Sequence, residues 1–163
     1  MARSAASDDM ARWYHAAHDR PGTADARPRV SVSDHDPITA ANARFYRAFE
    51  TLDIHEMDRV WSHGEHVRCI HPGWPLLVGW AAVRRSWETI FANTAEMSFT
   101  LSSVDVVAAG ELAWVTCTEN ILSEVRGRVT VTSVLATNVF ERDVERWLLV
   151  HHHASHVLGH ATP

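Results

Sequence analysis

The chain has 163 residues, 46% of them hydrophobic and 21% charged, with a formal net charge of −5 when the histidines are neutral. A chain of this length suits one domain that buries roughly 70% of its unfolded surface, and an acidic balance lacks the basic patch of nucleic-acid-binding proteins. No apolar run approaches the roughly 20 residues of a membrane-spanning helix, so we expect neither a nucleic-acid nor a membrane partner.

The two ends of the sequence predict tails. Residues 1–35 are rich in Ala, Asp, Arg, Ser and Pro without a sustained period, and they predict a poorly structured tail with a short helix around Met10–His18. Residues 159–163 are predicted to form a C-terminal tail. The first residues carry acids where a signal peptide needs an apolar segment, and Cys69 and Cys117 lack the spacing of a metal motif or a disulfide framework. These features predict a cytoplasmic protein with reduced thiols.

The first half of the predicted domain is mostly helical. Asp36-Pro37 is a helix-start signal, and the apolar residues that follow recur at helical spacing over roughly 37–51. Asp53 resembles the start of a capping box for a second, short helix. A short alternating strand then ends at Pro72-Gly73, and Gly79 precedes a third helix with its own apolar stripe.

From Met97 onward the pattern has period two and predicts four strands. They span roughly 97–108, 112–123, 128–142 and 146–157, and short turns separate them, which favours an antiparallel arrangement. Helices first and strands later predict an α+β domain with the helices on one face of a curved sheet. If the residues of the last strand alternate strictly, large side chains lie on both of its faces. A sheet that is apolar on both faces must pack against other protein elements on each face, and the helices can cover only one of them. We therefore expect a homodimer.

Three segments carry a resemblance to a known family, namely ARFYRAFETLDIHEMDRVW, VRCIHPGWPLLVGWAAVRRSW and LATNVFERDVERWLLVHHHAS. Their order and spacing resemble the SnoaL-like group of the nuclear transport factor two-like superfamily, over a domain predicted to span 36–158. The resemblance implies a cone-shaped fold, in which three N-terminal helices pack on a strongly curved, mostly antiparallel sheet around a mostly apolar pocket. Members include ketosteroid isomerases, polyketide cyclases, dehydratases, epoxide hydrolases and non-catalytic assembly domains, so the fold alone leaves the function open.

The resemblance also implies catalytic positions. His71 falls where ketosteroid isomerases place a carboxylate base, Asn138 where they place a protonated acid, and Phe45 where they place a tyrosine that completes the oxyanion hole. A neutral imidazole at position 71 can accept a proton, and the Asn138 amide can donate to an oxyanion. Tyr46 is adjacent to Phe45, but one helical step rotates it by about 100°. The structural alternatives are a His71 bonded to a backbone carbonyl and an Asn138 bonded to a buried backbone group.

Further residues are candidates for contacts with a substrate. Trp61, Trp74 and Trp87 offer flat apolar surface, although each is equally compatible with a plain core, and Trp74 lies in a loop that could form the pocket mouth. The resemblance places His152 on the pocket face. Glu119 shares its strand parity with apolar neighbours, yet we expect it at the solvent-exposed rim.

The histidine triplet invites a metal-binding interpretation. His151 and His153 share one strand face about 6.7 Å apart, but no third ligand is evident, and the subunit contact is the alternative location. We expect no metal and no cofactor. The sequence thus predicts a pocket protein that binds a small apolar carbonyl, polyketide-like or terpenoid-like molecule, with proton abstraction, isomerisation or cyclisation by His71 and Asn138 as one possibility. A non-catalytic ligand-binding or homodimerisation module is the second, and a metal-binding protein that uses the His151–His153 region is the third.

Overall fold

A computed structural model describes residues 32–157, with side chains described from residue 37 onward. The predicted short helix Met10–His18 and the predicted C-terminal tail lie outside the described residues. The first described helix begins at Val32, five residues before the predicted start at Pro37, which lies inside the helix. The Asp36-Pro37 pair therefore lies within this helix and does not mark its beginning. Proline has no backbone N–H to donate, so the helix lacks the donor that another residue would supply at position 37.

Three helices and one six-stranded sheet make up the described part of the chain. The helices are α2 (Val32–Glu50), α3 (Ile54–Val60) and α4 (Trp80–Asn93). The strands are β1 (Arg68–Ile70), β2 (Leu77–Val78), β3 (Glu96–Ala109), β4 (Leu112–Val125), β5 (Arg128–Asp143) and β6 (Arg146–His156). Their order in the sheet is β2-β1-β6-β5-β4-β3. All neighbours pair antiparallel except β1 and β6, which are parallel.

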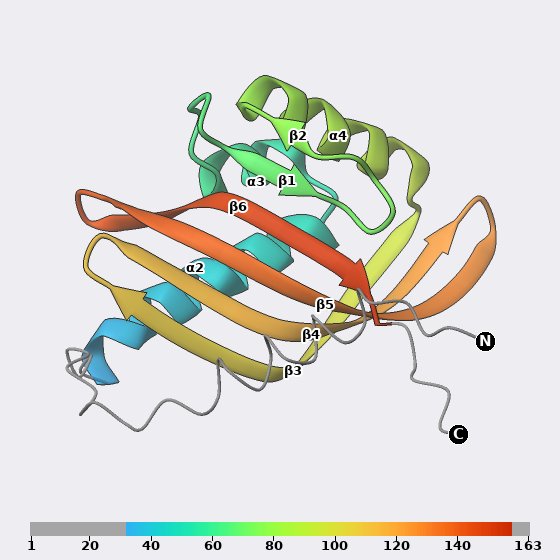
Figure 1. The fold of residues 1–163 in the computed structure, drawn as a ribbon. Helices are drawn as coiled ribbons and strands as arrows, with labels where there is room; N and C mark the ends of the chain where they lie inside the picture. Colours follow the sequence, from blue (N-terminus) through green and yellow to red (C-terminus); the bar gives the residue numbers. More distant parts are fainter. Residues whose placement is uncertain (1–31, 158–163) are drawn as a thin grey trace, which may run out of the picture.

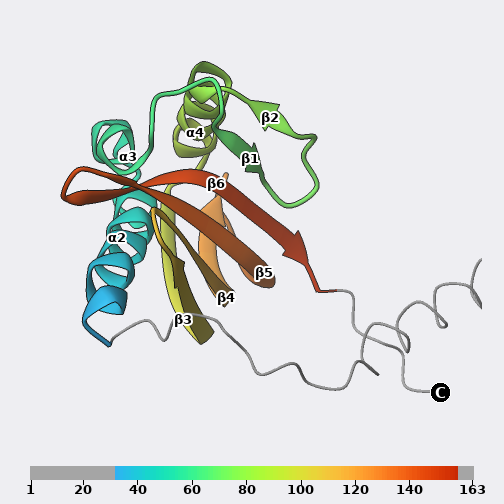
Figure 2. The ribbon, with the colours of Figure 1, turned by 60° about the vertical axis from the view of Figure 1, so that its left-hand side comes forward.

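The helices cover one side of the curved sheet, and this arrangement confirms the predicted α+β, cone-type fold. In Figure 1 the long helix α2 crosses behind strands β3 to β6, and Figure 2 shows α2, α3 and α4 together on that side. The local signals for the two shorter helices are also confirmed. Asp53 caps α3 by accepting a hydrogen bond from the backbone N–H of His55 at 2.8 Å, and Gly79 with φ 79° precedes α4.

A β-bulge changes the side-chain pattern of β6. Val139 of β5 pairs with His151 and Phe140 pairs with Leu149, so that Val150 is an extra residue between two paired positions. Because of this extra residue, Leu149 and His152 both face the helices although their numbers differ in parity. The expectation of strict alternation along this strand is therefore wrong.

The core lies between the helices and the concave face of the sheet. Its largest fully buried members include Phe45, Trp61, Trp87, Phe140 and Leu149. The rings of Phe45 and Trp87 approach with centroids 5.8 Å apart in an edge arrangement that aromatic pairs favour. Within the described residues, no helix combines the length and the apolar character needed to cross a membrane.

Candidate active site

A cavity of about 210 Å³ opens between the helices and the inner face of the sheet. Polar groups in its lining include His71, Glu119 and His152, and the indole of Trp74 contributes to the same wall. His71 follows β1, Glu119 lies on β4 and His152 on β6, so these three side chains come from separate parts of the sheet. All three of these side chains are buried.

His71 is held as a neutral imidazole. Its Nε2 lies 2.8 Å from the hydroxyl of Ser86, and that hydroxyl donates its proton to the carbonyl of Val83 at 2.6 Å. The Ser86 oxygen must then accept from His71, which places the imidazole proton on Nε2 and leaves the lone pair on Nδ1. Burial lowers the pKa of His71 to about 4. At neutral pH this side chain can accept a proton but carries no charge.

Glu119 is a buried acid, with 1% of its surface exposed. The expectation that it lies at a solvent-exposed rim is therefore wrong. Tyr46 of α2 donates its hydroxyl proton to Glu119 Oε1 at 2.7 Å, and this hydrogen bond partly offsets the loss of hydration. Burial nevertheless raises the pKa of Glu119 to about 7. The carboxyl group is thus close to half protonated at neutral pH.

Asn138 ties three elements together beside the cavity. Its amide nitrogen donates to Asn42 Oδ1 at 2.8 Å and to the hydroxyl of Tyr46 at 3.1 Å. Its carbonyl oxygen lies 2.7 Å from Nδ1 of His152, which must therefore carry the imidazole proton. Burial, together with the neighbouring His71, lowers the pKa of His152 well below its ordinary value. Both amide hydrogens of Asn138 are used inside the protein, and its amide fixes the orientation of the His152 ring.

Tyr46 reaches the site although one helical step separates it from Phe45. Both residues are buried, and their ring centroids lie 5.0 Å apart in an edge arrangement. The curved sheet encloses a wide stripe of α2, so two adjacent helical positions can both face inward. The expectation that Tyr46 points away is therefore wrong. Its hydroxyl joins Asn138 to Glu119 in one hydrogen-bonded chain.

The predicted aromatic contacts divide between the cavity and the core. Trp74 is 40% exposed and lines the cavity at its mouth. Phe45, Trp61 and Trp87 are fully buried and do not line the cavity. The ring of Trp87 nevertheless packs against the His71 imidazole in an edge arrangement, with ring centroids 4.6 Å apart.

The other two histidines of the triplet lie away from the cavity. His151 pairs with Val139 and His153 with Thr137, on the face of the sheet opposite the helices. Their ring centroids are 6.3 Å apart. Among residues 37–157 no group of three or more His, Cys, Asp or Glu side chains is placed to hold a metal ion.

Two buried thiols flank the polar groups. Sγ of Cys69 lies 3.7 Å from Nε2 of His71, and Sγ of Cys117 lies 3.3 Å from the Tyr46 hydroxyl. Burial raises the pKa of both thiols. Both sulfurs therefore keep their protons at neutral pH, which does not suit a nucleophile.

Two members of the site had no signal in the sequence. Asn42 was hidden in an ordinary helical stretch, and Ser86 lies between Arg85 and Trp87 in the third predicted helix. The sequence does place Asn42 on the same helical face as Tyr46, because Asn42 precedes Tyr46 by four residues. Nothing in the sequence indicated which strand groups they would meet.

The family model of the SnoaL-like domain matches residues 38–159, which include every described residue of this site. The chain belongs to the SnoaL-like family. Its fold is accordingly that of the nuclear transport factor two-like superfamily.

Two solved structures resemble this SnoaL-like domain in sequence as well as in fold. A provisionally assigned dehydratase of the NTF2-like family from Streptomyces avermitilis is 41% identical, with a TM-score of 0.74, and the match covers 78% of this chain and 98% of that one. A provisionally assigned association domain of a calcium/calmodulin-dependent protein kinase type II from Thiobacillus denitrificans is 32% identical. Its TM-score is 0.66, and the match covers 74% of this chain and 94% of that one.

A curated relative extends the similarity to a plant protein. The F-box protein SKIP8 of Arabidopsis thaliana is 31% identical to the SnoaL-like domain over 121 residues, which is 74% of this chain. The chain spans about half the length of that relative.

Proposed function

We propose that this SnoaL-like protein is a cofactor-independent acid–base enzyme, in which His71 is the base and Glu119 the acid. The observation that carries the proposal is that both side chains line one buried cavity, with the pKa of His71 lowered to about 4 and that of Glu119 raised to about 7. Between these two values the imidazole is neutral and the carboxyl group is largely protonated. Two titratable groups whose pKa values are pushed apart in one cavity are suited to opposite roles in proton transfer.

The chemistry that fits this pair is proton transfer next to a carbonyl group. Nδ1 of His71 accepts the proton from the carbon beside the carbonyl, and the electron pair of the broken C–H bond forms an enolate. Glu119 then gives its proton to a departing hydroxyl, which leaves as water while a C=C bond forms. Delivery of the same proton to a carbon atom would instead complete an isomerisation. The similarity to a provisionally assigned dehydratase supports elimination of water as the reaction.

Asn138 takes a different role from the one that the resemblance implied. Because both of its amide hydrogens are donated to Asn42 and Tyr46, we assign it as a positioning residue for His152 and for Tyr46. His152 in turn presents its unprotonated Nε2 as a hydrogen-bond acceptor for a hydroxyl group of the substrate.

The cavity also limits the substrate. Its volume of about 210 Å³ lies below the 300–1,000 Å³ that drug-sized ligands typically occupy, so the substrate is a small molecule. Trp74, Ile121 and Val134 supply apolar walls around the polar groups. A small β-hydroxy ketone with a flat apolar part fits these constraints.

A direct test uses the β-hydroxy ketone formed from benzaldehyde and acetone, because its loss of water gives a conjugated enone whose absorbance can be followed. We expect the wild-type protein to accelerate this loss, with a rate that is highest between pH 4 and 7 and falls above pH 7 as Glu119 loses its proton. His71→Gln and Glu119→Gln should each lower the rate by about 100-fold or more.

The control is His66→Gln, since His66 is exposed and pairs with Glu141 away from the cavity. This variant should retain the wild-type rate. Thermal melting of each variant shows whether it is folded. A rate equal to that of buffer for the wild type, or equal rates for folded His71→Gln and wild type, would refute the assignment.

A second candidate function is a non-catalytic association module. The similarity to a provisionally assigned kinase association domain favours it, as does the apolar character of the outer sheet face, where Leu112, Trp114, Leu122 and Leu135 are exposed. We propose that this face is covered by a second copy of the chain in a homodimer located in the cytoplasm. Dimerisation is compatible with catalysis, and the rate measurements above separate the two functions.

A further inference from the structure

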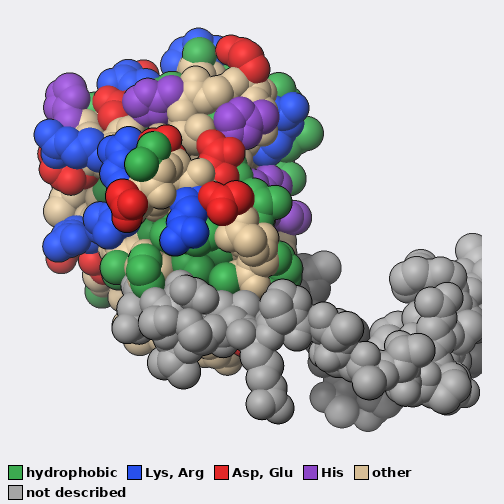
Figure 3. All heavy atoms as spheres, turned by 90° about the vertical axis from the view of Figure 1, so that its left-hand side faces the viewer, with side chains coloured by type: hydrophobic (Ala, Val, Ile, Leu, Met, Phe, Trp, Pro, Cys, Tyr) green, Lys and Arg blue, Asp and Glu red, His purple; other side chains and the backbone are tan. Residues whose placement is uncertain are grey.

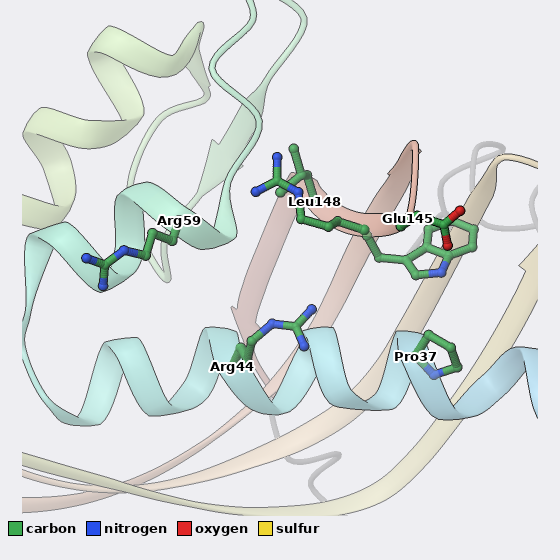
Figure 4. Close-up of a pocket in the computed structure, with 7 residues that line it drawn as sticks. Pro37, Arg44, Arg59, Glu145 and Leu148 are labelled. Atoms are coloured by element: carbon green, nitrogen blue, oxygen red, sulfur yellow. The ribbon is translucent and has the colours of Figure 1, made fainter.

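Two neighbouring surface cavities lie on the outer side of α2, away from the acid–base site. One has a volume of about 380 Å³ and lies between α2, α3 and the start of β6, and the other, of about 410 Å³, lies between α2 and α3. They share Arg44 and Arg59, and none of their lining residues lines the catalytic cavity. In Figure 4 Arg44 rises from α2 between Pro37 on one side and Arg59 of α3 on the other.

Positive charge predominates in the pair of cavities although the chain as a whole is acidic. Four guanidinium groups line them, those of Arg44, Arg47, Arg59 and Arg146, against the two carboxylates of Glu56 and Glu145. Figure 3 faces this side of the molecule and shows arginine side chains close together and interspersed with acidic ones. Arg59 pairs with Glu56, and Arg146 pairs with Asp143 at 2.9 Å. Arg44 and Arg47 form no ion pair with the described acidic residues.

The basic side chains on this surface suit an anionic ligand. Arg44 and Arg47 are three residues apart, so they are neighbours on one face of the helix. The chain has no lysine, and the planar guanidinium groups of its arginines match the oxygen atoms of a phosphate in a bidentate geometry. The cavity that contains Arg146 adds the apolar surfaces of Trp147, Leu148 and Pro37 beside these charges.

From this combination we propose a second ligand site, at which a small soluble organic phosphate binds. Its phosphate group contacts Arg44 and Arg146, which line one cavity together with Trp147 and Leu148, and its apolar part lies against those two apolar side chains. Charge complementarity selects an anion, and the apolar wall selects an organic molecule over inorganic phosphate. The site is independent of the proposed acid–base reaction.

Phenyl phosphate is a suitable probe, with benzoate as the carboxylate counterpart, in calorimetric titrations of the full chain at constant ionic strength. We expect phenyl phosphate to bind more tightly than benzoate or inorganic phosphate. Each lost charge-assisted contact costs about tenfold in affinity, so Arg44→Ala and Arg146→Ala should each weaken binding by about that factor. Arg85→Ala is the matched control, because Arg85 is an exposed arginine on α4 outside both cavities, and it should bind as the wild type does.

Several outcomes would overturn the site. Absence of binding to the wild type would do so, as would equal weakening by Arg85→Ala, which indicates diffuse attraction to surface charge. Equal affinity for benzoate would remove the preference for phosphate. Binding to vesicles that contain phosphatidic acid without binding to phenyl phosphate would identify a lipid headgroup and would refute a soluble ligand. Melting curves of the variants show that a loss of binding is not a loss of folding.

Discussion

At the scale of single residues, the burial of Glu119 makes the stability of the protein depend on pH. A carboxyl group in this position loses most of its hydration and gains one hydrogen bond from Tyr46. Its pKa rises from 4.5 to about 7, so between these values the folded protein binds more protons than the unfolded chain. The free energy of unfolding therefore falls as the pH rises through this window, by about 3 kcal/mol in total.

Glu119→Gln should remove this loss of stability. Glutamine keeps an oxygen that can accept the Tyr46 hydrogen bond but has no proton to lose. Relative to wild type, we expect the variant to gain about 3 kcal/mol between pH 4.5 and pH 8. Urea unfolding at a series of pH values measures the difference. Glu96→Gln, at an exposed carboxylate, is the control, and a constant difference between Glu119→Gln and wild type across the series would contradict the burial of a titrating group.

The sequence indicated only some of the residues that gather around this cavity, for identifiable physical reasons. The resemblance directed attention to His71 and His152, and the structure places both at one cavity. Glu119 was expected at the rim because burying a carboxyl group is costly, and its compensating partner Tyr46 lies 73 positions away. A contact of such sequence separation has no local signature, so the sequence alone could not reveal the acid.

At the scale of elements, local sequence signals predicted those helix and strand ends that local interactions determine. The cap at Asp53 and the glycine at position 79 located α3 and α4, and the turns separated the four long strands close to their observed ends. The bulge at Val150 was not predictable, because it arises from the register between β5 and β6. This single extra residue turns His152 toward the cavity while leaving Trp147 and Leu149 in the core.

Asp53→Ala tests how much the cap of α3 contributes. The variant loses the side-chain oxygen that accepts the His55 N–H, so we expect a loss of about 1 kcal/mol in the free energy of unfolding. Asp53→Asn retains an oxygen in the same position and should remain within a few tenths of a kcal/mol of wild type. Chemical denaturation of both variants measures the effect, and equal losses would show that the charge of Asp53, not its capping oxygen, is what matters.

At the scale of the whole molecule, the sheet has one face on the core and one face that the proposed dimer would cover. Leu135 is 53% exposed on this outer face, and Thr118 of β4 and Ser155 of β6 pair with it on either side. We expect Leu135→Glu to shift the protein from dimer to monomer, since two carboxylates would be buried at the contact.

Sedimentation velocity over a range of protein concentrations measures this shift. Val144→Glu is the control, because Val144 is an even more exposed apolar residue but lies in the turn between β5 and β6. A wild-type protein that sediments as a monomer throughout, or a dimer that withstands Leu135→Glu, would contradict the proposed contact.

The two buried thiols can report on local opening of the fold. Cys69 lies on β1 and Cys117 on β4, so they belong to strands on opposite sides of the β5–β6 pair, and neither side chain reaches solvent. A thiol-reactive dye can modify either one only after the strands separate from the helices. The labelling rate of each sulfur therefore measures how often its own half of the sheet opens. A molecule bound in the cavity would lower this labelling rate.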